Sequence, residues 1–410
     1  MAREAVVFRL CVLVVAVHLV DDSFLQPQPG TSAGDHLASG LLPIAVLALA
    51  GWAYPRLRAG LRATIALVLG PLGIIAGAEA VRYMSGPGLS GDDYTGLLAI
   101  PAGVALLGLG TVTLWRTRRR DDGLPRRYAR RASLTVGGLL VAVWVVIPLM
   151  LAYGVTHIAR PLQRVADLGV AHERVTLTTS DGLRLAGLYV PSRNGAAVIA
   201  FPGRNGPQRH ARMLARHGYG VLLVDRRGEG GSEGDPQGFG WTFDKDILAG
   251  VAFLERRRDV DPGRIGGLGL SVGGEMMLQT AAESEGLAAV VSEGAGARVI
   301  SEELDDLAGV QKWLMLPHFA TKTASLAVFS NHAPPANLTK LIPRIAPRPV
   351  FLINAAHGEV DDKTPEYFRA AKEPKSTWAV PAGRHTGGIT ARPEEYERRV
   401  VGFFDRALGR

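Results

Sequence analysis

Ser271 lies in the sequence Gly269-Leu270-Ser271-Val272-Gly273, between an apolar run at 264–270 and a helical pattern at 272–283. A G-x-S-x-G pattern between a buried strand and a helix is typical of a nucleophile elbow, a sharp turn that exposes the serine hydroxyl. Small residues on both sides let strand and helix approach closely, and the helix N-terminus then points at the reacting centre. The pattern predicts that Ser271 is a nucleophile.

A serine hydroxyl is a weak nucleophile until a base removes its proton, and the base needs an acid to orient it. Behind a nucleophile elbow, these groups follow in the order Ser, Asp or Glu, His. His385 lies in a glycine-rich loop just after the last predicted strand, 377–380, and is the expected base. A loop at this position can bring the imidazole over the serine.

The acid should follow the strand predicted at 350–354. The next loop carries Glu359, Asp361 and Asp362 before a helix that starts at Pro365. Asp361 is the expected acid and Glu359 is the alternative.

Two other kinds of site compete with a serine nucleophile in this sequence. Gly267-Leu268-Gly269, with Glu293 further on, begins like a dinucleotide-binding fingerprint, but its third glycine would fall at Val272. His357 and its neighbouring carboxylates could bind a metal, but no second ligand cluster with suitable spacing accompanies them. The sequence therefore predicts no cofactor and no metal.

The elements that position these residues alternate between strands and helices. A β-hairpin is expected over 173–191, with its turn at 180–182. The expected strands are 197–201, 220–225, 265–270, 288–292, 350–354 and 377–380, and the expected helices are 208–217, 242–257, 272–283, 365–372 and 393–408. This alternation predicts an α/β fold with a mostly parallel, doubly wound sheet covered on both faces.

Residues 172–410 resemble the α/β-hydrolase superfamily, near its dienelactone-hydrolase-like and serine-aminopeptidase-like branches. Residues 201–206 (FPGRNG) look like the family's H-G-x-x-G oxyanion loop, with Pro202 in place of the histidine, and residues 225–232 (DRRGEGGS) match its D-x-R-G-x-G-x-S turn. The resemblance implies oxyanion donors on the backbone N–H groups of Val272 and Arg204, with Gly203 in the same loop.

The resemblance also implies that an insertion at about 297–347 forms a helical cap over the site. Its apolar residues would line a pocket for an acyl or lipid-like substrate, or form the core of the cap itself. These residues are Trp313, Leu314, Met315, Leu316, Phe319 and Phe329.

Five apolar segments precede residue 157, at 6–20, 37–54, 63–81, 95–115 and 134–153. The last four are each about long enough to cross a bilayer core of roughly 30 Å as helices. The first contains Arg9 and His18 and is the weakest; a cleaved signal peptide is its alternative reading, although no clear cleavage site precedes Asp21. A soluble helical bundle is the alternative for the whole region. We expect about five transmembrane helices.

The net charge of +8 is concentrated in one short segment. Residues 116–131 hold eight arginines against Asp121 and Asp122. A basic loop between apolar spans is typical of a cytoplasmic loop beside anionic lipid, so no nucleic-acid partner is expected. Basic and acidic loops alternate, which predicts an extracytoplasmic hydrolase domain. The single cysteine, Cys11, excludes an intrachain disulfide.

Together these patterns predict three regions: transmembrane helices over 1–156, a linker over 157–171, and a hydrolase domain over 172–410. The expected activity is that of a serine hydrolase in the cell membrane, acting on an ester, thioester or amide of a small-molecule or lipid-like substrate. An ester is favoured because no pair of acidic residues obviously awaits a substrate amine. The alternatives are a serine peptidase and a non-catalytic binding or sensing protein on a hydrolase fold.

Overall fold

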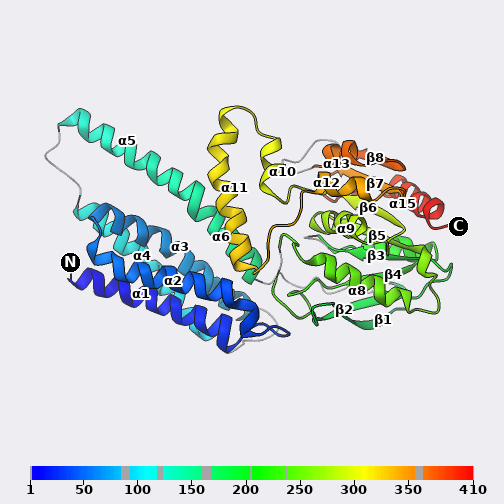
Figure 1. The fold of residues 1–410 in the computed structure, drawn as a ribbon, viewed down its shortest axis with the longest axis horizontal. Coiled ribbons are helices and arrows are strands. Elements are labelled where there is room, and N and C mark those ends of the chain that lie inside the picture. The colour runs from blue at the N-terminus through cyan, green and yellow to red at the C-terminus, as the bar shows by residue number, and fades with distance from the viewer. Residues whose placement is uncertain are drawn as a thin grey trace. The chain divides into compact units, whose positions relative to one another are not determined.

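The computed structural model describes residues 2–84, 93–117, 123–158, 168–203, 206–236, 238–355 and 363–409. The chain forms two compact units (Figure 1). The first comprises Met1–Ala159 and Leu307–Ala333, and the second comprises Arg160–Asp306 and Pro334–Arg410. Residues 307–333, which form part of the expected cap, belong to the first unit.

The second unit is built on one eight-stranded sheet in the order β1-β2-β4-β3-β5-β6-β7-β8. β2 pairs with β1 and β4 in antiparallel fashion, and all other neighbours are parallel. The strands are β1 Glu173–Thr178, β2 Arg184–Val190, β3 Ala197–Phe201, β4 Gly220–Val224, β5 Ile265–Leu270, β6 Ala289–Glu293, β7 Val350–Ala355 and β8 Lys375–Val380. The mostly parallel order confirms the predicted α/β-hydrolase fold.

The central strands are apolar along their whole length because helices cover both faces of the sheet. In β3, Ile199 and Phe201 point into one buried cluster with helices α8 (Phe243–Glu255) and α9 (Val272–Glu283). Val198 and Ala200 point into the opposite cluster with α7 (Gln208–Arg216) and α15 (Pro393–Ala407). The remaining helices of this unit are α10 Ile300–Asp305, α12 Leu338–Leu341, α13 Thr364–Ala370 and α14 Gly388–Ala391.

The first unit is helical. Its helices are α1 Ala2–Val20, α2 Leu37–Ala53, α3 Ala59–Met84, α4 Asp93–Arg116, α5 Leu124–Val141, α6 Ile147–His157 and α11 Val310–Phe329, with a π-helical turn at Ala142–Val146 joining α5 to α6. Helices α3 and α4 approach closely, because a Cβ at Gly103 would lie only 2.5 Å from the carbonyl oxygen of Gly70. Such contacts between small residues are typical of helices that pack inside membranes.

Four stretches among the described residues are long and apolar enough to cross a membrane: Ala33–Arg56, Ala59–Arg82, Tyr94–Arg116 and Leu124–His157. They correspond to the last four of the five expected spans. The first expected span is helix α1, which is not among these stretches. It nevertheless contributes Phe8, Val12 and Val15 to the buried core of the first unit.

Helix α11 lies in the sequence between β6 and β7 but packs within the first unit. The ring of Phe329 meets Tyr153 and His157 of α6 edge-on, at centroid distances of 5.5 and 5.8 Å. Trp313 and Leu314, expected to line a pocket or a cap core, are exposed instead. The apolar residues of the insertion therefore do not all line a pocket, and they do not all form the core of a cap.

Candidate active site

Ser271 forms the turn between β5 and α9. Its backbone adopts φ 54° and ψ −127°, a combination that costs a non-glycine residue free energy and is found at functional sites. The turn is held by a hydrogen bond from Ser271 N to Glu293 O (2.8 Å) and by one from Gly274 N to Ser271 O (2.7 Å). A Cβ at Gly273 would lie 2.7 Å from the carbonyl oxygen of Pro202, so a larger residue would displace the β3 loop.

His385 reaches this serine from the loop between β8 and α14. Its Nε2 lies 2.8 Å from Ser271 Oγ, a hydrogen-bonding distance. The loop is bent by positive φ values at Ala382 and Thr386 and closed by a hydrogen bond from Gly387 N to Arg384 O (2.8 Å). The structure thus brings together the expected nucleophile and the expected base.

Two of the residues expected at the oxyanion site, Val272 and Gly203, lie at the same turn. Val272 is the first residue of α9, so its N–H has no acceptor within the helix and can donate to a bound oxyanion. Gly203 lies against the elbow, where a Cβ would come within 2.7 Å of Ser271 Cβ. Arg204 lies outside the described residues.

Both candidate acids, Asp361 and Glu359, also lie outside the described residues, as does His357 of the alternative metal site. The end of their loop is anchored at Lys363. Its backbone N–H donates to Ala295 O (2.9 Å), and its buried ammonium pairs with Asp306 Oδ1 (2.5 Å). Lys363, which directly follows the acid-bearing loop, therefore lies beside the segment that follows β6.

Glu293, at the end of β6, connects the elbow to the histidine loop. Its backbone carbonyl accepts from Ser271, and its buried carboxylate accepts from Gly388 N (2.8 Å) and Tyr396 Oη (2.7 Å). His210 Nε2 lies 3.7 Å from the same carboxylate. Burial alone would raise the pKa of Glu293, but His210, Tyr396 and Gly388 stabilise the carboxylate, and its net pKa lies below the ordinary value.

Sequence reasoning missed this role of Glu293 and considered the residue only as a possible cofactor ligand. One signal was available: an acidic residue directly follows the buried strand predicted at 288–292, next to the strand that carries the nucleophile. Buried carboxylates are rare unless they are paired or hydrogen-bonded.

A model of the X-Pro dipeptidyl-peptidase (S15) family matches residues 147–379, which is more than half of the chain. The chain belongs to the S15 family. It is a hydrolase of the esterase or peptidase type. The matched residues include Ser271 and the segment that carries Asp361, and they end before His385.

Similar proteins match a comparable part of the chain. The uncharacterised protein YfhR of Escherichia coli K12 is 27% identical over 261 residues, covering 58% of this chain and 81% of its own length. The uncharacterised protein Rv2307c of Mycobacterium tuberculosis is 31% identical over 258 residues, covering 59% and 81%. The Pyrococcus furiosus esterase Pf2001 has a similar structure, with a TM-score of 0.49, 23% identity, and coverage of 61% of this chain and 97% of its own.

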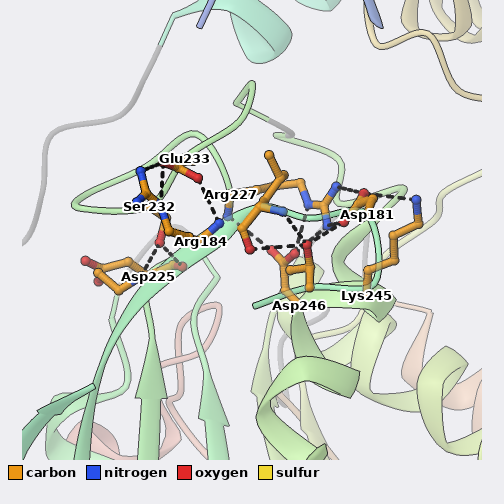
Figure 2. Close-up of polar contacts among 11 residues, drawn as sticks. Asp181, Arg184, Asp225, Arg227, Ser232, Glu233, Lys245 and Asp246 are labelled. Carbon is orange, nitrogen blue, oxygen red and sulfur yellow. Dashed lines mark hydrogen bonds and ion pairs between the residues drawn. The ribbon is translucent and has the colours of Figure 1, made fainter. Parts of the chain in front are cut away.

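In this S15-family chain the turn at residues 225–232 has a structural role. Figure 2 shows two polar groups in and around it. In the first, Ser232 Oγ donates to Asp225 O (2.6 Å) and accepts from Ala186 N (3.0 Å), which holds the turn against β2. Glu233 adds an ion pair with Arg184 at the start of β2.

The second group in Figure 2 is centred on the buried Arg227. Its guanidinium pairs with the fully buried Asp246 of α8 (2.7 Å) and with Asp181 in the β1–β2 turn (2.9 Å). Lys245 also pairs with Asp181 (3.0 Å). These contacts join the hairpin, the turn after β4 and helix α8, and so fix one end of the sheet.

Proposed function

We propose that this protein is a membrane-anchored serine hydrolase that cleaves an ester through an acyl-enzyme intermediate. The observation that carries the proposal is the 2.8 Å distance between His385 Nε2 and the oxygen of Ser271, which sits in a strained strand-to-helix turn. The four apolar stretches of the first unit support the anchoring.

In this proposal Ser271 Oγ attacks the substrate carbonyl carbon while His385 Nε2 takes its proton. The N–H groups of Val272 and Arg204 donate to the oxyanion; one such donor typically contributes about 3–4 kcal/mol to the transition state. The His385 imidazolium then gives its proton to the leaving alcohol. Water, deprotonated by the same imidazole, attacks the acyl-enzyme, and the imidazolium returns this proton to Ser271 Oγ as the acid is released. Asp361 orients the imidazole, and Glu359 is the alternative for this role.

A serine peptidase is the second candidate, because the matching family model is that of an X-Pro dipeptidyl-peptidase. The nucleophile, base and oxyanion donors would be the same in either case, and only the leaving group would differ. A panel of acyl esters of increasing chain length, beside Xaa-Pro anilides, distinguishes the two candidates. We expect turnover of esters, and turnover of the anilides alone would favour the peptidase.

Fluorophosphonate labelling of the full-length protein in detergent tests the mechanism directly. We expect wild type to be labelled, and both Ser271→Ala and His385→Ala to lose labelling. Asp361→Asn should slow labelling by about 10²–10⁴-fold, within the range of a misoriented base, whereas Glu359→Gln should stay close to wild type. A folded wild type that resists labelling would contradict the proposal and favour a non-catalytic binding protein.

A further inference from the structure

Helix α11 has an unusual distribution of polar and apolar side chains. Its exposed residues Val310, Trp313, Leu314, Ala320 and Ala324 lie within about a third of the helix circumference at 3.6 residues per turn, so they form one apolar stripe. Val310 is 82% exposed, Trp313 75% and Leu314 48%. A helix of a water-soluble domain normally turns such a stripe toward its core.

The side of α11 that faces the other helices of the first unit buries three polar side chains beside the apolar Leu326 and Phe329. Lys322, Thr323 and Ser325 are buried, and the Lys322 ammonium lies 5.4 Å from the centre of the Phe319 ring. A helix with polar groups inside and apolar groups outside suits a lipid environment, because polar side chains in a bilayer face the protein interior.

Hydrogen bonds attach the first half of α11 to the segment between α5 and α6. Trp144 Nε1 donates to Leu314 O (2.8 Å), and His318 Nδ1 lies 2.7 Å from Val143 O, which can only accept. Both Val143 and Trp144 belong to the π-helical turn Ala142–Val146. A π turn opens the regular hydrogen-bond pattern of a helix, and here an outside donor meets one of its carbonyls.

The end of the same segment is attached to α2. Asn331 Oδ1 accepts from Ala38 N (3.0 Å) and Ser39 N (3.3 Å), which are in the first turn of α2. These N–H groups have no acceptor within their own helix, so Asn331 acts as a helix cap supplied from about 290 residues away. Helix α11 is thus fixed to two of the four stretches that are apolar enough to cross a membrane.

We infer that α11 is a membrane-contacting helix whose apolar stripe lies against the acyl chains of the bilayer. The inference rests on the proposed membrane anchoring: the stripe belongs to a helix bonded to two apolar stretches, and the lipid that surrounds those stretches is the partner that reaches it. Lys312, next to Trp313, can extend its ammonium to the polar surface.

Site-specific quenching by lipid tests this inference on the full-length protein in phosphatidylcholine vesicles. In a Cys11→Ser background, one cysteine at a time is labelled with the fluorophore NBD: Trp313→Cys and Ala320→Cys on the stripe, Leu49→Cys on α2, and Glu285→Cys on the exposed turn before β6. Some vesicles carry nitroxide-labelled acyl chains. A cooperative thermal unfolding transition like that of wild type shows that each variant is folded.

We expect fluorescence at the stripe to be quenched at least half as strongly as fluorescence at Leu49. Fluorescence at Glu285 should be unaffected. Two stripe positions guard against a local failure to fold. If Leu49 is quenched but the stripe positions remain unquenched like Glu285, the inference about α11 is overturned and the proposed membrane anchoring stands. Absence of quenching at Leu49 as well would overturn the membrane anchoring with it. Quenching of the stripe in a protein that hydrolyses nothing would support the inference and contradict the proposed activity.

Discussion

At the scale of single residues, Glu293 is the main candidate for a residue that positions Ser271 and His385. Its main chain holds the Ser271 turn, and its side chain holds the loop that carries His385. Both the nucleophile and the base therefore depend on one buried residue, although the described contacts of its carboxylate are with His210, Gly388 and Tyr396 instead of with His385.

Replacing Glu293 by Gln should destabilise the protein by about 1.5–3 kcal/mol, the usual value of a hydrogen bond to a charged group. The pKa of Glu293 is lower in the folded protein than its ordinary value. Its stabilisation is thus fully present above about pH 4.3, the unfolded value, and is lost as the pH falls toward the folded pKa. Thermal unfolding of both proteins between pH 3.5 and 7 should show their difference shrinking on acidification.

The exposed Glu285→Gln is the matched control and should unfold like wild type at every pH. Fluorophosphonate labelling separates a positioning role from a purely structural one. Glu293→Gln should be labelled more slowly at a temperature where it remains folded. Equal labelling rates, or an unfolding difference that does not change with pH, would contradict the role.

At the scale of elements, Arg227 connects three of them. Arg227 and Asp246 are both buried, so removal of one partner leaves the other as an uncompensated charge. Arg227→Met should therefore lower the free energy of unfolding by about 3–5 kcal/mol. Lys245→Met, which removes a half-exposed cation from Asp181, should cost less than about 1 kcal/mol.

Chemical unfolding in mild detergent measures both variants. The double variant Arg227→Met with Asp246→Leu should recover part of the loss, because neither buried charge then remains. A single Arg227→Met that unfolds like wild type would show that the buried pair contributes nothing.

The elements around the nucleophile could be predicted because their patterns are local. The expected strand at 265–270 and helix at 272–283 coincide with β5 and α9. An apolar run before a small-residue turn determines both elements without reference to the rest of the chain. Ser271 and His385, which flank such elements, could be named for the same reason.

The location of α11 could not be predicted in this way. Apolar residues such as Trp313 and Phe329 suit a cap, a pocket or a membrane-contacting helix equally well. The distinction comes from Trp144, His318 and Asn331, whose partners lie about 170 to 290 residues away in the sequence. Glu293 escaped notice for a similar reason, since its partners His210 and Tyr396 lie on two separate helices.

At the scale of the whole molecule, the arginines around α5 predict on which side of the membrane each loop between the apolar stretches lies. Basic loops remain in the cytoplasm, which predicts that the catalytic unit is extracytoplasmic. In a Cys11→Ser background, a membrane-impermeant maleimide should label Glu285→Cys in intact cells. It should label Arg131→Cys only after permeabilisation. The reverse pattern would place the catalytic unit in the cytoplasm.

Leu307–Ala333 leaves the catalytic unit and returns to it, so the backbone passes between the two units at three places: 159/160, 306/307 and 333/334. A single proteolytic cut between 159 and 168 would separate the spans from the catalytic unit in sequence, but α11 would still hold the two fragments together. In the proposed membrane-anchored, extracytoplasmic arrangement, such a cut would therefore not release the catalytic unit. A recombinant fragment that begins at residue 172 would carry the α11 stripe into water, so a soluble form should also replace residues 307–333 by a short loop.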